Sequence, residues 1–109
     1  MGREFIETKD FESQWNKLKL TDEDMIVLQK ELLTNPRKGA VIQGGNGLRK
    51  IRVAFPNRGK SGSARVCYVD FAIDEQIYLI RVYAKNEQEN LSKSELNELS
   101  NLINKLKEV

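Results

Sequence analysis

The sequence LRKIRVAF at residues 48–55 decides the fold, because apolar and basic side chains alternate along it. Successive side chains of a β-strand point to opposite faces, so Ile51 and Val53 are expected to face a hydrophobic core. Lys50 and Arg52 then point to the other face of the sheet. This stretch therefore predicts a strand with one buried side and one positively charged side.

Further elements are predicted on both sides of this strand. Residues 64–73 and 76–83 have the composition of two more strands, with a tight turn between them, and residues 4–7 predict a short first strand. Two helices are expected between the first strand and the other three, and one helix after them. The predicted fold is α+β in the order β-α-α-β-β-β-α, with a mainly antiparallel sheet and the helices packed on one face.

An apolar stripe and two capping boxes indicate where the helices lie. In a capping box, a Ser or Thr side chain and an acidic residue three positions later each bind the other's backbone N–H group at the helix start. The residues are Phe11, Trp15 and Leu18 for the stripe, and Thr21 with Asp24 and Ser92 with Glu95 for the boxes. Asn35 and Pro36 are expected to end the second helix.

Positive charge is concentrated in the middle of the chain. Residues 32–69 carry eight lysines and arginines and no acidic residue, while the other ten basic residues share the rest of the chain with all sixteen acidic ones. The formal net charge of +2 thus combines +8 in this block with −6 elsewhere. One positive surface on an otherwise acidic body is typical of a domain that binds a polyanion, with phosphate as the leading candidate. A solvated basic loop without a partner is the alternative.

Composition limits the remaining possibilities. A chain of 109 residues, 39% of them hydrophobic, fits one domain over residues 1–109, and without a long apolar run a cytoplasmic protein with no membrane partner is expected. The chain has no histidine, which removes the usual general base near neutral pH and the commonest zinc ligand. Its only cysteine, Cys67, lies in an apolar run and is expected to be buried. We therefore expect a site of Lys, Arg, Tyr or carboxylate groups, with no metal or other cofactor.

The last predicted strand places further polar side chains on the basic face. Its apolar set is expected to face the helices, and the other set to lie on the opposite face. The apolar set is Tyr78, Ile80, Val82 and Ala84, and the opposite set is Leu79, Arg81, Tyr83 and Lys85. Arg65 fits either face, because the sequence around it is apolar on both sides. If helices cover only one side of the sheet, Lys50, Arg52 and Arg65 can converge with the second set on an open concave face.

Four segments of the chain carry a resemblance to a known family. They are Val41-Ile42-Gln43-Gly44, Gly47-Leu48-Arg49-Lys50-Ile51-Arg52, Gly59-Lys60 through Arg65-Val66, and Tyr78-Leu79 leading to Val82-Tyr83-Ala84-Lys85-Asn86-Glu87. In this order and spacing they resemble a HigB-type toxin of the RelE/ParE superfamily, over nearly the whole chain.

The resemblance implies a RelE-like fold and the toxin of a bacterial type II toxin–antitoxin system. Such a toxin is an endonuclease that cuts mRNA in the A site of the 70S ribosome and so inhibits translation. The implied partner is a HigA-like antitoxin with a helix-turn-helix domain, and operator DNA would be contacted only indirectly, through that antitoxin.

The resemblance also assigns roles to residues. The family's basic strand corresponds to Arg49, Lys50 and Arg52, its phosphate-gripping arginine to Arg65, and its Tyr-x-Lys-Asn segment to Tyr83, Lys85 and Asn86. Together with strand parity and the basic loop, this gives Arg65, Tyr83 and Lys85 as predicted catalytic residues and Arg49, Lys50, Arg52, Arg58, Lys60, Arg81 and Asn86 as predicted RNA and phosphate ligands. The Gly44–Gly47 loop departs from the family's Gly-Thr-Gly-Gly, and the histidines that some relatives carry are absent.

The expected chemistry is metal-free attack of the RNA 2′-hydroxyl on the adjacent phosphorus. Arg65 would bind the non-bridging oxygens in the transition state, while Tyr83 or Lys85 would act as base or acid. The surrounding positive charge is expected to lower the pKa of both groups. A non-catalytic gyrase inhibitor of the ParE type, or an RNA-binding module, is the alternative on the same fold. Tyr83 with Lys85 favours the nuclease, since electrostatic binding alone needs no titratable hydroxyl.

Overall fold

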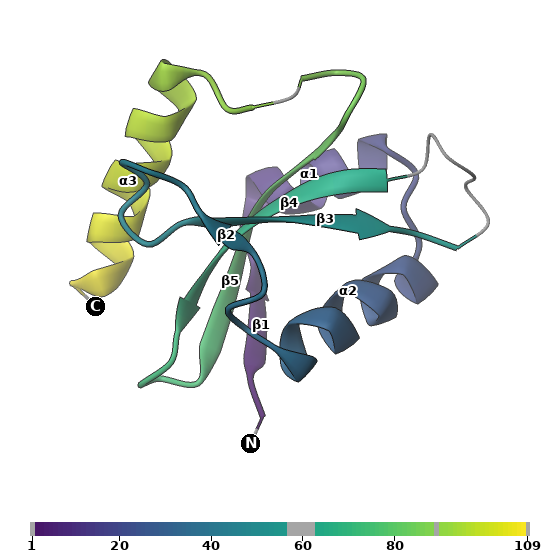
Figure 1. The fold of residues 1–109 in the computed structure, drawn as a ribbon, viewed down its shortest axis with the longest axis horizontal. Coiled ribbons are helices and arrows are strands. Elements are labelled where there is room, and N and C mark those ends of the chain that lie inside the picture. The colour runs from purple at the N-terminus through teal and green to yellow at the C-terminus, as the bar shows by residue number, and fades with distance from the viewer. Residues whose placement is uncertain (1, 57–62, 89, 109) are drawn as a thin grey trace.

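The computed structural model describes residues 2–56, 63–88 and 90–108, which form a five-stranded sheet and three helices (Figure 1). The elements are β1 (Glu4–Glu7), α1 (Lys9–Lys17), α2 (Asp22–Thr34), β2 (Ala40–Val41), β3 (Arg49–Ala54), β4 (Ser63–Phe71), β5 (Gln76–Ala84) and α3 (Lys93–Lys107). The predicted α+β class is confirmed, and β2 is an additional strand. None of the described helices is long and apolar enough to cross a lipid bilayer.

The sheet has the strand order β1-β5-β4-β3-β2. β1 runs parallel to β5, and the other three pairings are antiparallel, so the prediction of a mainly antiparallel sheet is confirmed. The long strand β4 lies in the centre and pairs with β3 and β5. The sequence pattern missed β2 because two residues are too few to show an alternation.

Both predicted capping boxes are present. At the start of α2, the Thr21 hydroxyl accepts a hydrogen bond from the Asp24 amide at 3.2 Å, and the Asp24 carboxylate accepts one from the Thr21 amide at 2.9 Å. Ser92 and Glu95 make the same reciprocal pair at the start of α3, at 3.1 and 3.0 Å. These contacts satisfy amide groups that have no partner inside the helix, and they fix where each helix begins.

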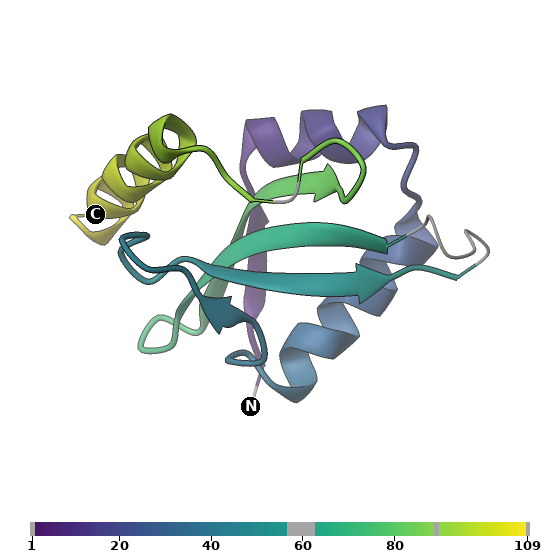
Figure 2. The ribbon, with the colours of Figure 1, turned by 45° about the horizontal axis from the view of Figure 1, so that its top comes forward.

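The helices lie on both faces of the sheet (Figure 2). α1 and α2 cover one face, where Phe11 and Leu28 pack with Val66 on β4. α3 covers part of the other face, where Leu99 and Ile103 pack with Cys67, the next residue of β4. The prediction that all helices pack on one face is therefore wrong for α3. The physical reason is that β4 is apolar on both sides, so each side must be covered.

A bulge in β5 changes the face that its side chains occupy. Cys67 pairs with Arg81 whereas Tyr68 pairs with Leu79, so Ile80 is an extra residue without a partner on β4. Before the bulge, even-numbered side chains face α3, and after it the odd-numbered ones do. The prediction that the apolar side chains of this strand all lie on one face of the sheet is therefore wrong. Tyr78 and Ile80 pack with the α3 cluster, and Val82 and Leu79 pack with α1 and α2.

Candidate phosphate-binding site

A first row of site residues crosses three strands on the face that carries α3. Arg52 on β3 pairs with Arg65 on β4, and Arg65 pairs with Tyr83 on β5. Side chains directly opposite one another on a sheet have Cβ atoms about 4.5–5.5 Å apart, so two guanidinium groups and a phenol share a small area. Arg65 and Tyr83 are each 5% exposed, whereas Arg52 is exposed. The row therefore runs from solvent into the protein.

Arg65 carries a buried positive charge that the described part of the chain does not neutralise. No carboxylate of the described residues forms an ion pair with it. Its Nη1 atom is buried and has no hydrogen-bond partner among those residues. A buried donor left unpaired costs about 1–3 kcal/mol, and such groups in native structures are commonly explained by a function. An oxyanion at this position would supply both the missing acceptor and the missing charge.

A second row lies one pair further along the same strands. Lys50 pairs with Cys67, and Cys67 pairs with Arg81. The Lys50 ammonium donates a hydrogen bond to the Asn90 side chain at 2.8 Å, a neutral partner that leaves its charge in place. Arg81 instead donates to the Glu95 carboxylate at 3.4 Å, so its charge is largely compensated. Lys50 is therefore better placed than Arg81 to hold a phosphate.

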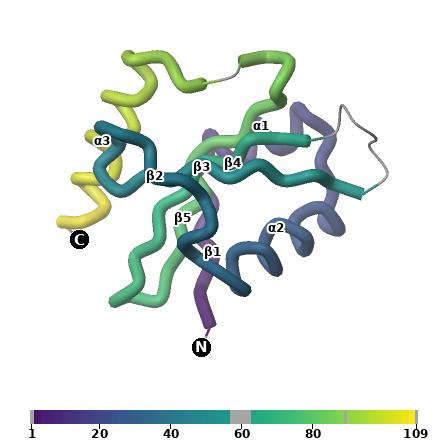
Figure 3. Tube along the Cα trace, in the orientation of Figure 1, coloured from purple at the N-terminus to yellow at the C-terminus, as the bar shows by residue number. Residues whose placement is uncertain are grey.

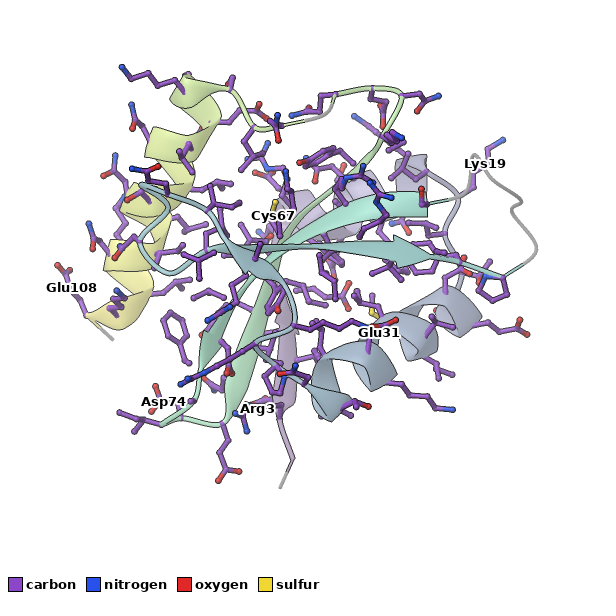
Figure 4. All side chains as sticks on the ribbon, in the orientation of Figure 1. Arg3, Lys19, Glu31, Cys67, Asp74 and Glu108 are labelled. Carbon is purple, nitrogen blue, oxygen red and sulfur yellow. The ribbon has the colours of Figure 1, made fainter. Side chains whose placement is uncertain are left out.

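Cys67 lies in the middle of the sheet (Figure 4). Its strand partners are Lys50 on one side and Arg81 on the other. Its side chain is fully buried. Burial raises the pKa of the thiol to about 12, although Lys50 and Arg81 act in the opposite direction. The reactive form of cysteine is the thiolate, so Cys67 serves as packing and not as a nucleophile.

The pKa of the Tyr83 hydroxyl differs from the value expected from neighbouring charges alone. Burial is the largest effect and raises the pKa of its hydroxyl to about 12, while Arg65 lowers it by a smaller amount. The prediction that neighbouring positive charge lowers the Tyr83 pKa is therefore wrong. The sequence showed the charges but not the 5% exposure that outweighs them. At neutral pH the phenol keeps its proton, so it can donate a proton and does not act as a base.

Arg49 is not part of this surface. Its Nη1 atom donates hydrogen bonds to the backbone carbonyls of Gly39 at 2.8 Å and Arg37 at 3.2 Å. Strand alternation explains the difference, because Arg49 pairs with Tyr68 and lies on the opposite side of β3 from Lys50. The predicted grouping of Arg49 with Lys50 and Arg52 is therefore wrong in space.

The remaining predicted residues lie in loops. Lys85 and Asn86 are exposed in the turn that follows β5, so strand alternation does not extend to them. Lys85 is only two positions from Tyr83 along the chain. Arg58 and Lys60 lie outside the described residues. The structure thus brings together Lys50, Arg52, Arg65, Arg81 and Tyr83.

Sequence reasoning missed a role of Glu95 at this site. Besides closing the capping box, its carboxylate accepts hydrogen bonds from Arg81 and from the Gln88 side chain at 3.3 Å. The hydrogen bond from the Ser92 backbone is the largest of the effects that lower its pKa. Glu95 also borders a cavity of about 130 Å³ beside Tyr83. The capping motif located Glu95, but no local pattern indicates that its carboxylate reaches β5.

These features define a small α+β domain with a basic face, in which one buried arginine lies next to a protonated tyrosine. Over residues 4–109 the chain matches the family described as RelE toxin of the RelE / RelB toxin-antitoxin system. The chain therefore belongs to the RelE toxin family, and it is a toxin of a toxin–antitoxin system.

A solved structure shows the same fold. A doubly substituted variant of the E. coli toxin RelE in the free state aligns with a TM-score of 0.60 and 22% sequence identity, over 90% of this chain and 97% of that one. A RelE variant bound to a peptide of the antitoxin RelBc aligns with a TM-score of 0.48 and 18% identity, over 90% of this chain and 93% of that one.

Proposed function

We propose that this toxin is a HigB-like endonuclease that cuts mRNA in the A site of the 70S ribosome. The observation that carries the proposal is the buried, unneutralised guanidinium of Arg65 between Arg52 and Tyr83. A phosphodiester that gains negative charge in its transition state supplies what this arginine lacks. A cognate HigA-like antitoxin would hold the toxin inactive, and the ribosomal substrate would place the reaction in the cytoplasm.

The reaction needs no nucleophile from the protein. The 2′-hydroxyl of the message attacks the adjacent phosphorus, the bond to the 5′-oxygen of the next nucleotide breaks, and a 2′,3′-cyclic phosphate and a 5′-hydroxyl are left. Arg65 stabilises the non-bridging oxygens while Lys50 and Arg52 hold flanking phosphates. No described carboxylate forms an ion pair with the buried Arg65 or the half-buried Lys50, so the positive charge of both is available to a phosphate.

Acid and base roles divide between the two remaining residues. Tyr83 is the proton donor to the departing 5′-oxygen, because burial raises its pKa to about 12 and keeps it protonated. The role of proton acceptor then falls to Lys85, which is exposed in the turn after β5. A phenol with a pKa of about 12 is a weak proton donor at neutral pH, so alignment of the message by the ribosome must supply much of the rate.

A binding function without catalysis is the alternative, either as an inhibitor of DNA gyrase or as an RNA-binding module. The position of Tyr83 favours the nuclease. Its hydroxyl-bearing ring lies directly opposite Arg65, in a row that ends in solvent at Arg52. A surface that only attracts phosphate gains nothing from a buried phenol beside its central arginine.

The test is to map the 5′ ends of cellular mRNA after brief expression of the toxin. New 5′-hydroxyl ends at fixed positions within codons are expected, and they should vanish in Arg65→Ala. Lys38→Ala is the matched control, because Lys38 is an exposed cation of the same basic block that pairs with Glu31 at 2.6 Å. Growth arrest without new mRNA ends would instead identify a non-catalytic inhibitor, and supercoiling assays would then test gyrase.

A further inference from the structure

A second basic hollow lies at the other end of β4 from Arg65. It has a volume of about 240 Å³, and its lining includes Arg37, Asn46, Arg49, Asp70, Phe71 and Lys107. Phe71 is six residues along β4 from Arg65, which corresponds to about 20 Å at the rise of a β-strand. The hollow is smaller than the roughly 300 Å³ at which pockets for drug-sized ligands begin, so it suits a phosphate group. It is therefore separate from the proposed reaction site.

The positive charge of this hollow is not compensated by the described residues. Arg49 donates to two backbone carbonyls, and Lys107 donates to the Asn46 side chain at 2.8 Å, so both have neutral partners. The acidic residue of the lining, Asp70, forms an ion pair with Arg3 at 2.9 Å. Arg37 is exposed and forms no ion pair with a described carboxylate. Three cations thus share one hollow with a carboxylate that is already neutralised.

Backbone geometry holds these cations in place. The segment after β2 reaches across to α3, as the tube trace shows (Figure 3). Asn46, at a φ of 59°, donates hydrogen bonds to the Ser100 carbonyl at 3.2 Å and the Asn104 side chain at 2.8 Å. The same side chain accepts the bond from Lys107. The cations from β3 and α3 are therefore positioned before any ligand arrives, which lowers the entropic cost of binding.

We propose that this hollow is a second RNA-binding site, which grips a backbone phosphate about 20 Å from the phosphate that reacts. Its chemistry is that of single-stranded RNA recognition, in which cations hold the backbone and an aromatic side chain, here Phe71, contacts a sugar or base. The inference rests on the proposed function only in taking RNA as the ligand. The RNA is either the message beyond the cut position or ribosomal RNA.

The test compares two double variants of the whole protein with equal charge. Arg37→Ala with Lys107→Ala removes two cations of the hollow, and Lys30→Ala with Lys105→Ala removes two exposed cations from α2 and α3 that do not line it. Affinity is measured against salt concentration, with a 2′-O-methylated RNA oligonucleotide that cannot be cut and with vacant 70S ribosomes. Thermal melting followed by circular dichroism checks that both variants fold.

Loss of one phosphate contact should lower the magnitude of the slope of log K against log salt by about 0.7–0.9 in the hollow variant, and the control should keep the parental slope. A change with the oligonucleotide alone assigns the hollow to the message, and a change with ribosomes alone assigns it to ribosomal RNA. A change with both shows that the hollow binds the backbone of either RNA. Equal slopes for the two variants in both measurements would overturn the inference. Because the oligonucleotide cannot react, a toxin that never cleaves RNA would refute the proposed function and leave this binding result intact.

Discussion

Replacing Arg65 with methionine should abolish toxicity and at the same time stabilise the fold. The side chain is 5% exposed, and its Nη1 atom has no hydrogen-bond partner among the described residues. Removing an unsatisfied buried donor recovers about 1–3 kcal/mol, and an apolar side chain of similar length fills the same space. Relief of the repulsion from Arg52, directly across the strand pair, adds a few tenths of a kcal/mol. We expect the free energy of unfolding to rise by about 1–3 kcal/mol.

Urea unfolding followed by circular dichroism measures this change. For a chain of this size 1 kcal/mol corresponds to roughly 4 °C in Tm, so a rise of at least 4 °C is expected in a thermal scan. Arg65→Ala supplies the comparison, because it removes the same charge but leaves a cavity where methionine would pack. It should therefore be less stable than Arg65→Met by about 2 kcal/mol or more, while both variants are inactive.

Arg52→Met is the matched control. Arg52 lies in the same row but is exposed, so its replacement should alter the free energy of unfolding by only about 0.5 kcal/mol. If Arg65→Met lowers stability by 1 kcal/mol or more, the arginine is satisfied in the folded protein. That result would refute the argument that the Arg65 guanidinium is left unpaired in order to bind a phosphate.

Further expectations follow from the same contacts. Tyr83→Phe should slow cleavage without changing its pH dependence between about 6 and 9, since a phenol with a pKa of about 12 stays protonated there. A cleavage rate that rises with pH in the parent protein but not in the variant would instead identify Tyr83 as a base. The burial of neutral Tyr83 stabilises the fold fully below pH 10 and loses this effect as pH rises towards 12, so Tyr83→Phe should reduce alkaline unfolding in a pH titration. Asn46→Ala should lower the free energy of unfolding by about 1–2 kcal/mol, and Asn46→Gly by less because glycine relieves the positive φ, so equal losses would argue against strain. Cleavage of ribosome-bound message by toxin stripped of metals should persist with only the magnesium that ribosomes require, and rescue by added zinc or manganese alone would contradict the scheme.

Local signals made most of the elements predictable. The capping boxes of α2 and α3 involve residues three positions apart, so the sequence alone contained both partners of each pair. The alternation at residues 49–54 likewise placed Ile51 and Val53 in the core and Arg52 outside it. Patterns of this kind depend on the geometry of one helix or one strand, and they do not require knowledge of what packs against it.

Contacts between distant segments were not predictable in the same way. The face chosen by α3 depends on β4 being apolar on both sides, and the link from Glu95 to Arg81 depends on where α3 then lies. The Tyr83 pKa shows the consequence for chemistry. Its neighbouring charges were visible in the sequence, but the burial that dominates its titration comes from α3 and the rest of the fold.

The bulge at Ile80 allows β5 to contribute side chains both to the hydrophobic core and to the candidate site. Leu79 faces α1 and α2. With strict alternation from Leu79, the side chains of Arg81 and Tyr83 would point into the same hydrophobic core. The extra residue resets the phase, so Leu79 stays in the core while Tyr83 pairs with Arg65 on the opposite face. Bulges commonly re-aim side chains next to functional sites. The same irregularity made half of the predicted strand parity wrong and brought Tyr83 beside the arginine with which we propose it acts.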